Sequence, residues 1–323
     1  MTILDAQSVA PWSNNTRRLG YRFLTIGMVI LALTTLSDTF FTANNVLNIL
    51  RQASLLFLLC SGLTLVILAG GLDLSIGANI ALSGCLAAMV IKATGTPWLG
   101  AIIGFGVGTI IGLLNGFLVT SLRLPAFIAT YGMMWVVNGL TYYVMAGRTI
   151  GDFPAAFRQL GSGYGFGIPI PVYLMAASLL IGVALMRWTI YGKQIYAIGA
   201  NATAAELSGI PVRRRLLFVY ATSGAMAGLA ALVFLARLNS ADANMGSTLL
   251  LPGLASVLVG GASLFGGTGS IFGTFTGAVL LTLILNGMNI LSVSSNWQPL
   301  ITGLIIVVAV FADATLRRES NTK

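Results

Sequence analysis

Long apolar runs alternate with short polar segments along most of this chain. Runs of about 15–20 apolar residues suit helices that cross a bilayer and are too long and too apolar for the strands of a membrane barrel. Open sheets cannot cross a membrane, because their edge backbone groups would lack hydrogen-bond partners in lipid. The pattern predicts an all-α polytopic membrane protein, with one transmembrane domain over residues 1–323 and ten spans. Their expected bounds are 23–36, 53–69, 76–91, 99–120, 127–145, 172–186, 216–235, 250–265, 271–291 and 300–312.

Lysine and arginine residues are divided unequally between the two sets of connecting segments. Ten spans place both termini on one side of the membrane, and positive residues near span ends favour the cytoplasmic side. The set on the side of the termini has twelve such residues and the opposite set has five, so both termini are expected in the cytoplasm. The twelve are Arg17, Arg18, Arg22, Arg123, Arg187, Lys193, Arg213, Arg214, Arg215, Arg317, Arg318 and Lys323; the five are Arg51, Lys92, Arg148, Arg158 and Arg237.

The composition narrows the class of protein further. Of 323 residues, 57% are hydrophobic and 8% are charged, whereas soluble domains carry about 25% charged residues. The net charge of +9 is explained by topology signals and contact with anionic lipid, so no nucleic-acid partner is expected. The chain has no His, which removes imidazole bases and His metal ligands, and we expect neither a catalytic nor a metal site. Cys60 and Cys85 lie in apolar runs and are expected to pack in the core.

The longest polar interruption after Val172 is the basic stretch 187–215. Within it, Thr203 and Glu206 have the spacing of a capping box, in which Thr203 would cap a short helix and Glu206 would reach back. Gly209 then supplies a stop, and Pro211 prevents the helix from resuming. So short a helix cannot span a membrane. It is expected either to lie on the membrane surface and dock on a partner, or to be an ordinary connector.

Glycine spacing predicts close helix packing. The expected fourth span carries a glycine at every fourth position, and small residues at that spacing let helix backbones approach closely in lipid. A weak internal echo, a similarity in sequence, relates residues 63–84 to 254–277. The glycine-rich parts of these two segments, at 70–77 and 260–269, could each be a full turn between spans or a re-entrant break. The ladder consists of Gly100, Gly104, Gly108, Gly112 and Gly116.

Few acidic residues lie inside the expected membrane region. Asp73 is the only one between two spans, and it could cap the next helix or form a substrate or gating contact. An ionic solute would meet a counter-charge along its path, so the neutral polar interior favours a neutral, hydroxyl-rich solute. The same side chains could instead bond helix to helix. The candidate pathway residues are Thr64, Asp73, Ser75, Asn79, Asn115, Asn138, Asn286 and Asn289.

The segment Gly266–Ser270 resembles a phosphate-binding loop before a helix. It lacks the Lys of a Walker A motif, so this chain is expected to hold no cofactor and to have no nucleotide site of its own. Active transport would then take its energy from another subunit or from an ion gradient.

Several stretches in the same order resemble the membrane subunit of ribose-type ABC sugar importers. The likeness is carried by GGLDLSIGANIALS at 70–83, by the segment from Phe40 to Leu50, by QIYAIGAN at 194–201 with LSGI at 207–210, and by LVGG at 258–261. One departure is the entrance to the expected eighth span, where relatives carry an acidic segment and this chain has LLPGL at 250–254.

This resemblance implies a multi-pass subunit of the bacterial plasma (inner) membrane with three kinds of protein partner. They are an ABC ATPase that binds ATP and Mg²⁺, a periplasmic or extracellular sugar-binding protein, and a second permease, either an identical copy or a paralogue. The short helix in the basic stretch would be the coupling helix that docks on the ATPase. The residues implied in coupling are Asn201, Thr203, Ala204, Ala205, Glu206, Leu207 and Gly209.

Two other functions stay open at this point. A branched-chain amino acid permease of the same superfamily is the first, although Gly-Leu-Asp-Leu-Ser at 71–75 favours the sugar branch by resemblance. A secondary transporter or channel that works without an ATPase is the second, and the scarcity of embedded acids argues against ion coupling.

Overall fold

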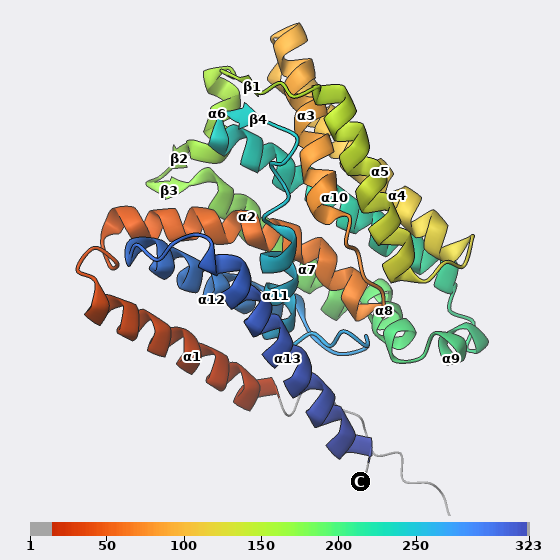
Figure 1. Cartoon of the computed structure of the whole chain (residues 1–323). Helices are drawn as coiled ribbons and strands as arrows, with labels where there is room; N and C mark the ends of the chain where they lie inside the picture. Colours follow the sequence, from red (N-terminus) through yellow and green to blue (C-terminus); the bar gives the residue numbers. More distant parts are fainter. Residues whose placement is uncertain (1–14, 322–323) are drawn as a thin grey trace, which may run out of the picture.

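The computed structural model describes residues 15–321. Within them the chain folds into helices with four two-residue strands (Figure 1), which confirms the all-α membrane class. The helices are α1 Asn15–Leu36, α2 Ala43–Leu68, α3 Ile76–Thr94, α4 Pro97–Thr120, α5 Ala126–Met145, α6 Ala155–Ser162, α7 Ile170–Trp188, α8 Ile190–Ala200, α9 Ala202–Leu207, α10 Val212–Leu238, α11 Leu250–Val259, α12 Ile271–Ile290 and α13 Trp297–Asn321. The strands are β1 Ile150–Gly151, β2 Tyr164–Gly165, β3 Ile168–Pro169 and β4 Ser240–Ala241.

Six of the described helices are long and apolar enough to cross a membrane, namely α2, α3, α4, α7, α10 and α12. Shorter apolar stretches lie at 22–36, 250–259 and 297–311. The expected span at 127–145 forms the 20-residue helix α5, which is not among the six. The expected span at 53–69 begins earlier, because Thr42 caps α2 by accepting a hydrogen bond from the Asn45 N–H at 3.4 Å.

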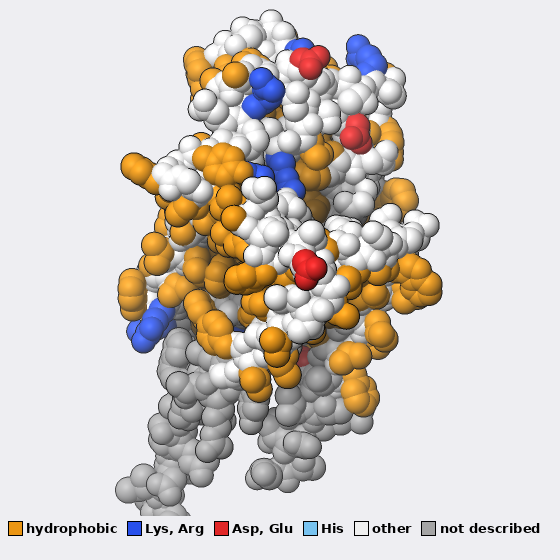
Figure 2. All heavy atoms as spheres, turned by 90° about the vertical axis from the view of Figure 1, so that its left-hand side faces the viewer, with side chains coloured by type: hydrophobic (Ala, Val, Ile, Leu, Met, Phe, Trp, Pro, Cys, Tyr) orange, Lys and Arg blue, Asp and Glu red, His pale blue; other side chains and the backbone are white. Residues whose placement is uncertain are grey.

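Two ends of the bundle can be distinguished (Figure 1). Helices α8 and α9 lie at one end, and α6 and the four strands lie at the other. β1 pairs antiparallel with β4, and β2 with β3. The segment between the expected spans at 127–145 and 172–186 therefore contains short ordered elements, namely β1, α6, β2 and β3. Figure 2 shows the left-hand side of Figure 1, where the few charged side chains lie mostly in the upper part and hydrophobic side chains extend along the flanks.

The glycine ladder of α4 packs against α10 inside this chain. A Cβ added to Gly108 would lie 2.5 Å from the Gly224 carbonyl oxygen, and one added to Gly224 would lie 2.7 Å from the Gly112 Cα. Backbone therefore meets backbone, with no room for side chains, as the spacing predicts.

Two helices end in the same hydrogen-bonded glycine turn, which supports the internal echo. At the end of α2, the N–H groups of Gly70 and Gly71 donate to carbonyls of the last turn, both at 2.9 Å. At the end of α11, Gly261 and Ala262 donate in the same way, at 2.8 and 3.2 Å. Gly70 and Gly261 have positive φ angles of 79° and 81°, which glycine adopts without strain.

The expected span at 250–265 is wrong in its extent. Helix α11 has 10 residues and ends at Val259, so it is about 15 Å long, roughly half of the hydrocarbon thickness. Gly260 and Gly261 end it, and the glycine-rich segment 260–270 leads directly to α12 as a break. Of the two alternatives that the sequence leaves open for 260–269, a full turn or a break, the structure has the break.

The α4–α10 contact can be tested with one methyl group. Gly112→Ala would place a Cβ against the Tyr220 carbonyl oxygen, and overpacking of this kind costs about 1–3 kcal/mol. We expect a lower midpoint of thermal unfolding and a lower membrane level. The matched control is Gly106→Ala on the same helix, where a Cβ meets nothing within 4 Å. Equal stability of the two variants would contradict the packing.

Candidate functional site

The short helix expected in the basic stretch is present as α9, but its cap differs from the expectation. Asn201, not Thr203, is the N-cap, and its side-chain oxygen accepts a hydrogen bond from the Ala204 N–H at 2.9 Å. The prediction of a capping box formed by Thr203 and Glu206 is therefore wrong. Asn201 has an extended backbone, with φ −161° and ψ 103°, as a cap requires, whereas Thr203 already lies inside the helix.

The other end of α9 is as expected. Gly209 has a φ of 81°, and its N–H donates to the Glu206 carbonyl at 2.9 Å while that of Ile210 donates to the Ala205 carbonyl at 3.1 Å. This pair of bonds is the Schellman motif, which satisfies the last carbonyls of a helix. Ala205 is buried, and Leu207 is 86% exposed. α9 is thus a helix closed at both ends that presents an apolar side chain to its surroundings.

A second helix in the basic stretch, α8, was missed from the sequence. Thr189 caps it by accepting from the Gly192 N–H at 3.4 Å. The Arg215 guanidinium lies 3.9 Å from the centre of the Tyr191 ring and donates to the Gln194 side chain. Because Arg215 belongs to α10, these contacts hold α8 against that helix. The Thr189 cap and the apolar residues that follow it were the sequence signal for α8.

The tyrosine Tyr196 connects α8 to the break before α12. Its hydroxyl donates to the Gly269 carbonyl at 2.9 Å. A tyrosine hydroxyl is protonated at physiological pH, and burial raises the pKa of this one further, to about 12. The link between α8 and the break is therefore insensitive to pH in that range.

Three backbone segments meet at the end of α8. The Gly267 N–H donates to the Leu68 carbonyl at 3.0 Å, which joins the break before α12 to the end of α2. Gly199 lies against both, since a Cβ added to it would touch that carbonyl oxygen and lie 2.5 Å from the Gly267 nitrogen. A Cβ on Gly266 would lie 2.7 Å from the Gly70 Cα. We call these five residues the backbone junction.

Asp73 is the centre of a buried polar cluster in the break between α2 and α3. One carboxylate oxygen accepts from the Ser75 N–H at 3.0 Å, the Ser75 hydroxyl at 2.7 Å and the Asn115 amide at 3.3 Å. The other accepts from the Ser223 hydroxyl at 3.0 Å. All four residues are at most 1% exposed. Asp73 thus bonds the start of α3 to α4 and α10, and it does not face an open path.

Two more of the candidate pathway residues also join helices. The Thr64 hydroxyl on α2 lies 2.7 Å from the Thr274 hydroxyl on α12. The Asn79 amide on α3 donates to the Gly108 carbonyl on α4 at 3.1 Å, and its oxygen accepts from Ser83 at 2.8 Å. Satisfied bonds of this kind hold membrane helices together.

The remaining candidates are spread over other elements. Asn286 on α12 and Asn45 on α2 exchange two amide hydrogen bonds, at 3.0 and 3.1 Å. Asn289 accepts from the Gln298 amide at 2.8 Å, and Asn138 is partly buried on α5. The structure therefore brings Asp73, Ser75 and Asn115 together and leaves the other candidates in separate contacts.

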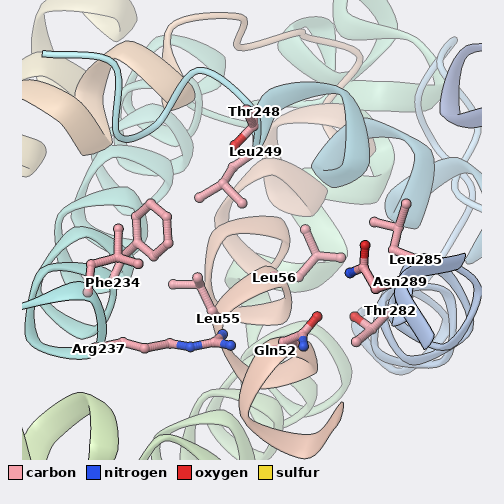
Figure 3. A pocket seen from close by; sticks show the side chains of 11 residues that line it. Gln52, Leu55, Leu56, Phe234, Arg237, Thr248, Leu249, Thr282, Leu285 and Asn289 are labelled. Atoms are coloured by element: carbon pink, nitrogen blue, oxygen red, sulfur yellow. The ribbon is translucent and has the colours of Figure 1, made fainter. Parts of the chain in front are cut away.

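A cavity of 380 Å³ lies between α2, α10, α12 and the segment before α11 (Figure 3). Its volume is within the roughly 300–1,000 Å³ of small-molecule sites. Asn289 is the one candidate pathway residue that lines it. Sequence reasoning missed its other polar residues, since they are far apart in the chain and form no motif. These are Gln52, Arg237, Thr248 and Thr282.

The structure is thus a membrane-type helical bundle whose helices break at glycine-rich turns and are joined through backbone to the segment that carries the exposed, capped helix α9. The chain belongs to the family described as "Branched-chain amino acid transport system / permease component", whose model matches residues 45–310.

Its relatives include the ribose import permease protein RbsC of Haemophilus influenzae, which is 37% identical over 90% of this chain and 91% of the relative. RbsC of Bacillus subtilis is 38% identical over 90% of this chain and 91% of the relative. The D-allose transport system permease protein AlsC of Escherichia coli is 36% identical over 92% of this chain and 91% of the relative. No solved structure matches the chain. The resemblance to ribose-type importer permeases is confirmed.

The Asp73 cluster makes a prediction about stability. Asp73→Ala would leave the Ser75 and Ser223 hydroxyls without their acceptor, whereas the Asn115 amide keeps its bond to the Ser75 hydroxyl oxygen at 2.7 Å. Each buried unpaired group costs about 1–3 kcal/mol. We expect a lower midpoint of thermal unfolding in detergent, measured by size-exclusion chromatography of heated samples. Asp73→Asn keeps one acceptor oxygen, and the Ser223 hydroxyl can turn to accept from the new amide, so it should be close to the unmodified protein.

Neither variant should change which solute is carried, because Asp73 is buried and both of its carboxylate oxygens already accept hydrogen bonds from neighbouring residues. A switch in solute preference by Asp73→Asn at a normal membrane level would show that the carboxylate contacts solute.

Proposed function

We propose that this chain is the permease subunit of an ABC importer for a neutral sugar or polyol. It would form the path for a solute that a periplasmic or extracellular binding protein delivers and that a separate ATPase drives across the membrane. The carrying observation is the identity to ribose and D-allose permeases over nine-tenths of both chains. The family description mentions branched-chain amino acids, but these full-length relatives favour the sugar branch.

We propose ten membrane crossings, by α1, α2, α3, α4, α5, α7, α10, α11, α12 and α13, with the segment 260–270 completing the crossing that the short helix α11 begins. This number puts both termini on the cytoplasmic side together with α8 and α9, in agreement with the excess of Lys and Arg there. The end that carries α6 and the strands would then receive the binding protein. The membrane would be a bacterial plasma membrane, and a second permease would complete the path.

The coupling step is assigned to α9. Its exposed Leu207 and the small residues Ala202 and Ala204 suit a shallow apolar groove on an ATPase, which would bind ATP and Mg²⁺. A helix closed at both ends is stiff over its short length. A push on α9 would pass to α8, which Tyr196 and the backbone junction join to the breaks after α2 and before α12.

The importer can be reconstituted in proteoliposomes with its ATPase and binding protein. We expect ATP-dependent uptake of D-ribose or D-allose, and no uptake by the chain alone. Full activity of the chain alone would eliminate the ATPase-coupled function and leave a secondary transporter.

Variants of α9 test the docking surface in the same assay. Asn201→Ala removes the cap of α9 at a cost of ~1 kcal/mol, too little to unfold the bundle, and Leu207→Asp replaces the exposed apolar side chain. Both should keep normal membrane levels, bind the ATPase more weakly in pull-down and reduce uptake. Thr203→Ala, on the same helix but not at the cap, is the matched control and should behave as the unmodified protein. If all three variants bind ATPase and take up sugar equally, α9 is only a connector.

A further inference from the structure

The cavity between α2, α10 and α12 contains polar groups that the protein itself does not satisfy. Thr282 is 3% exposed, and within the described residues its hydroxyl has no hydrogen-bond partner. Thr141 and Thr276, which are also buried, each donate to a backbone carbonyl at 2.7 Å. Buried hydroxyls are normally paired. A buried hydroxyl directed into a cavity is therefore available to a ligand.

Two further polar side chains of the lining are available in the same way. In the part of the chain that the structure describes, neither Gln52 nor Thr248 has a side-chain hydrogen bond. In Figure 3 the Gln52 amide lies between Arg237 and Thr282, and Thr248 lies at the opposite wall. Asn289 accepts one bond from Gln298 and keeps its amide N–H groups. The groups offered are thus both donors and acceptors.

Arg237 is the one cation among the lining residues. Its guanidinium donates to the Asn48 side chain at 3.3 Å, which leaves other N–H groups of the fork free to donate. The neighbouring Arg51 is engaged elsewhere, since it donates to the Tyr164 hydroxyl at 2.6 Å and lies 5.1 Å from the centre of that ring. No carboxylate lines the cavity.

We infer that this cavity is a transient binding site for a neutral, hydroxyl-rich solute on its way through the permease. Hydroxyl groups both donate and accept, so they can bond the amides and hydroxyls of the lining as well as the guanidinium, whereas an anion can only accept and leaves the acceptor groups of the lining without a partner. The walls formed by Leu55, Leu56 and Phe234 suit the C–H faces of a sugar ring, as small-molecule sites combine apolar walls with a few placed polar groups. This inference rests on the proposed function and specifies where the solute binds.

The site lies near the end of the bundle that receives solute in the proposed orientation. α10 ends at Leu238 and α12 at Ile290, both within two residues of a lining residue. Thr248 is exposed, so the cavity can be reached from outside the protein. A solute entering here would lie beside the segment that leads into α11.

Protection of an introduced cysteine from a thiol reagent tests directly whether sugar occupies the cavity. The two native cysteines, Cys60 and Cys85, are buried, so Thr248→Cys provides an accessible thiol at the cavity. In the reconstituted complex we expect D-ribose to slow its labelling by a membrane-impermeant thiol reagent, with saturation as the sugar concentration rises. Ser247→Cys is the matched control, because Ser247 is exposed but does not line the cavity, and its labelling should not change.

The identity of the ligand is tested with inorganic phosphate in place of sugar. Protection by D-ribose or D-allose, and not by phosphate, supports the inference. Equal labelling with and without sugar, or better protection by phosphate, overturns it. If sugar uptake is normal while protection is absent, the importer function stands and only this site is wrong. If the unmodified complex takes up neither sugar, the proposed function fails and this inference fails with it.

A pair of variants on α12 provides a second readout. Thr282→Val removes the available hydroxyl with little change in shape, and the loss of one hydrogen bond to solute should lower uptake by roughly tenfold at most. Thr276→Val is the matched control, because Thr276 is equally buried but bonds the Gly273 carbonyl. An equal decrease for both variants would mean that Thr282 acts only in folding.

Discussion

The backbone junction is the contact on which the rest of the structure depends. The Leu68 carbonyl accepts the Gly267 N–H at 3.0 Å, and Gly199 of α8 lies against both groups with no space for a side chain. The three segments, which are about 130 and 70 residues apart in sequence, are thereby held with their backbones in direct contact. The ends of α2 and α11, the start of α12 and the surface helix α9 all take their positions relative to this point. We therefore expect a shift of α8 to move both breaks.

The polar residues of the bundle serve mainly to hold helices in place. Asp73 accepts only neutral donors, from α3, α4 and α10, and so fixes the first break. The pairs Thr64–Thr274 and Asn45–Asn286 join α2 to α12. Since lipid offers no competing hydrogen bonds, such pairs specify how the helices pack. The cavity differs from these contacts, because its polar groups are available to a solute.

Much of the fold could be predicted from the sequence, and the failures have physical causes. The all-α membrane class and the close packing of α4 depend on local composition and spacing, so they were predicted correctly, as was the Gly209 stop. The cap of α9 was misassigned because Asn201 and Thr203 are both good caps, and backbone geometry decides between them. α11 was predicted too long because its apolar residues continue past Gly260. The cavity could not be predicted, since four separate elements form it.

Coupling across the junction is the central claim, and the ratio of ATP hydrolysed to sugar imported measures it most directly. Gly199→Ala would place a methyl group between the Leu68 carbonyl and the Gly267 nitrogen without altering the surface of α9. In the reconstituted complex, this account predicts normal ATPase binding and continued hydrolysis with a large loss of sugar uptake. An unchanged ratio, with the variant complex as stable as the unmodified one, would show that force does not pass through this contact.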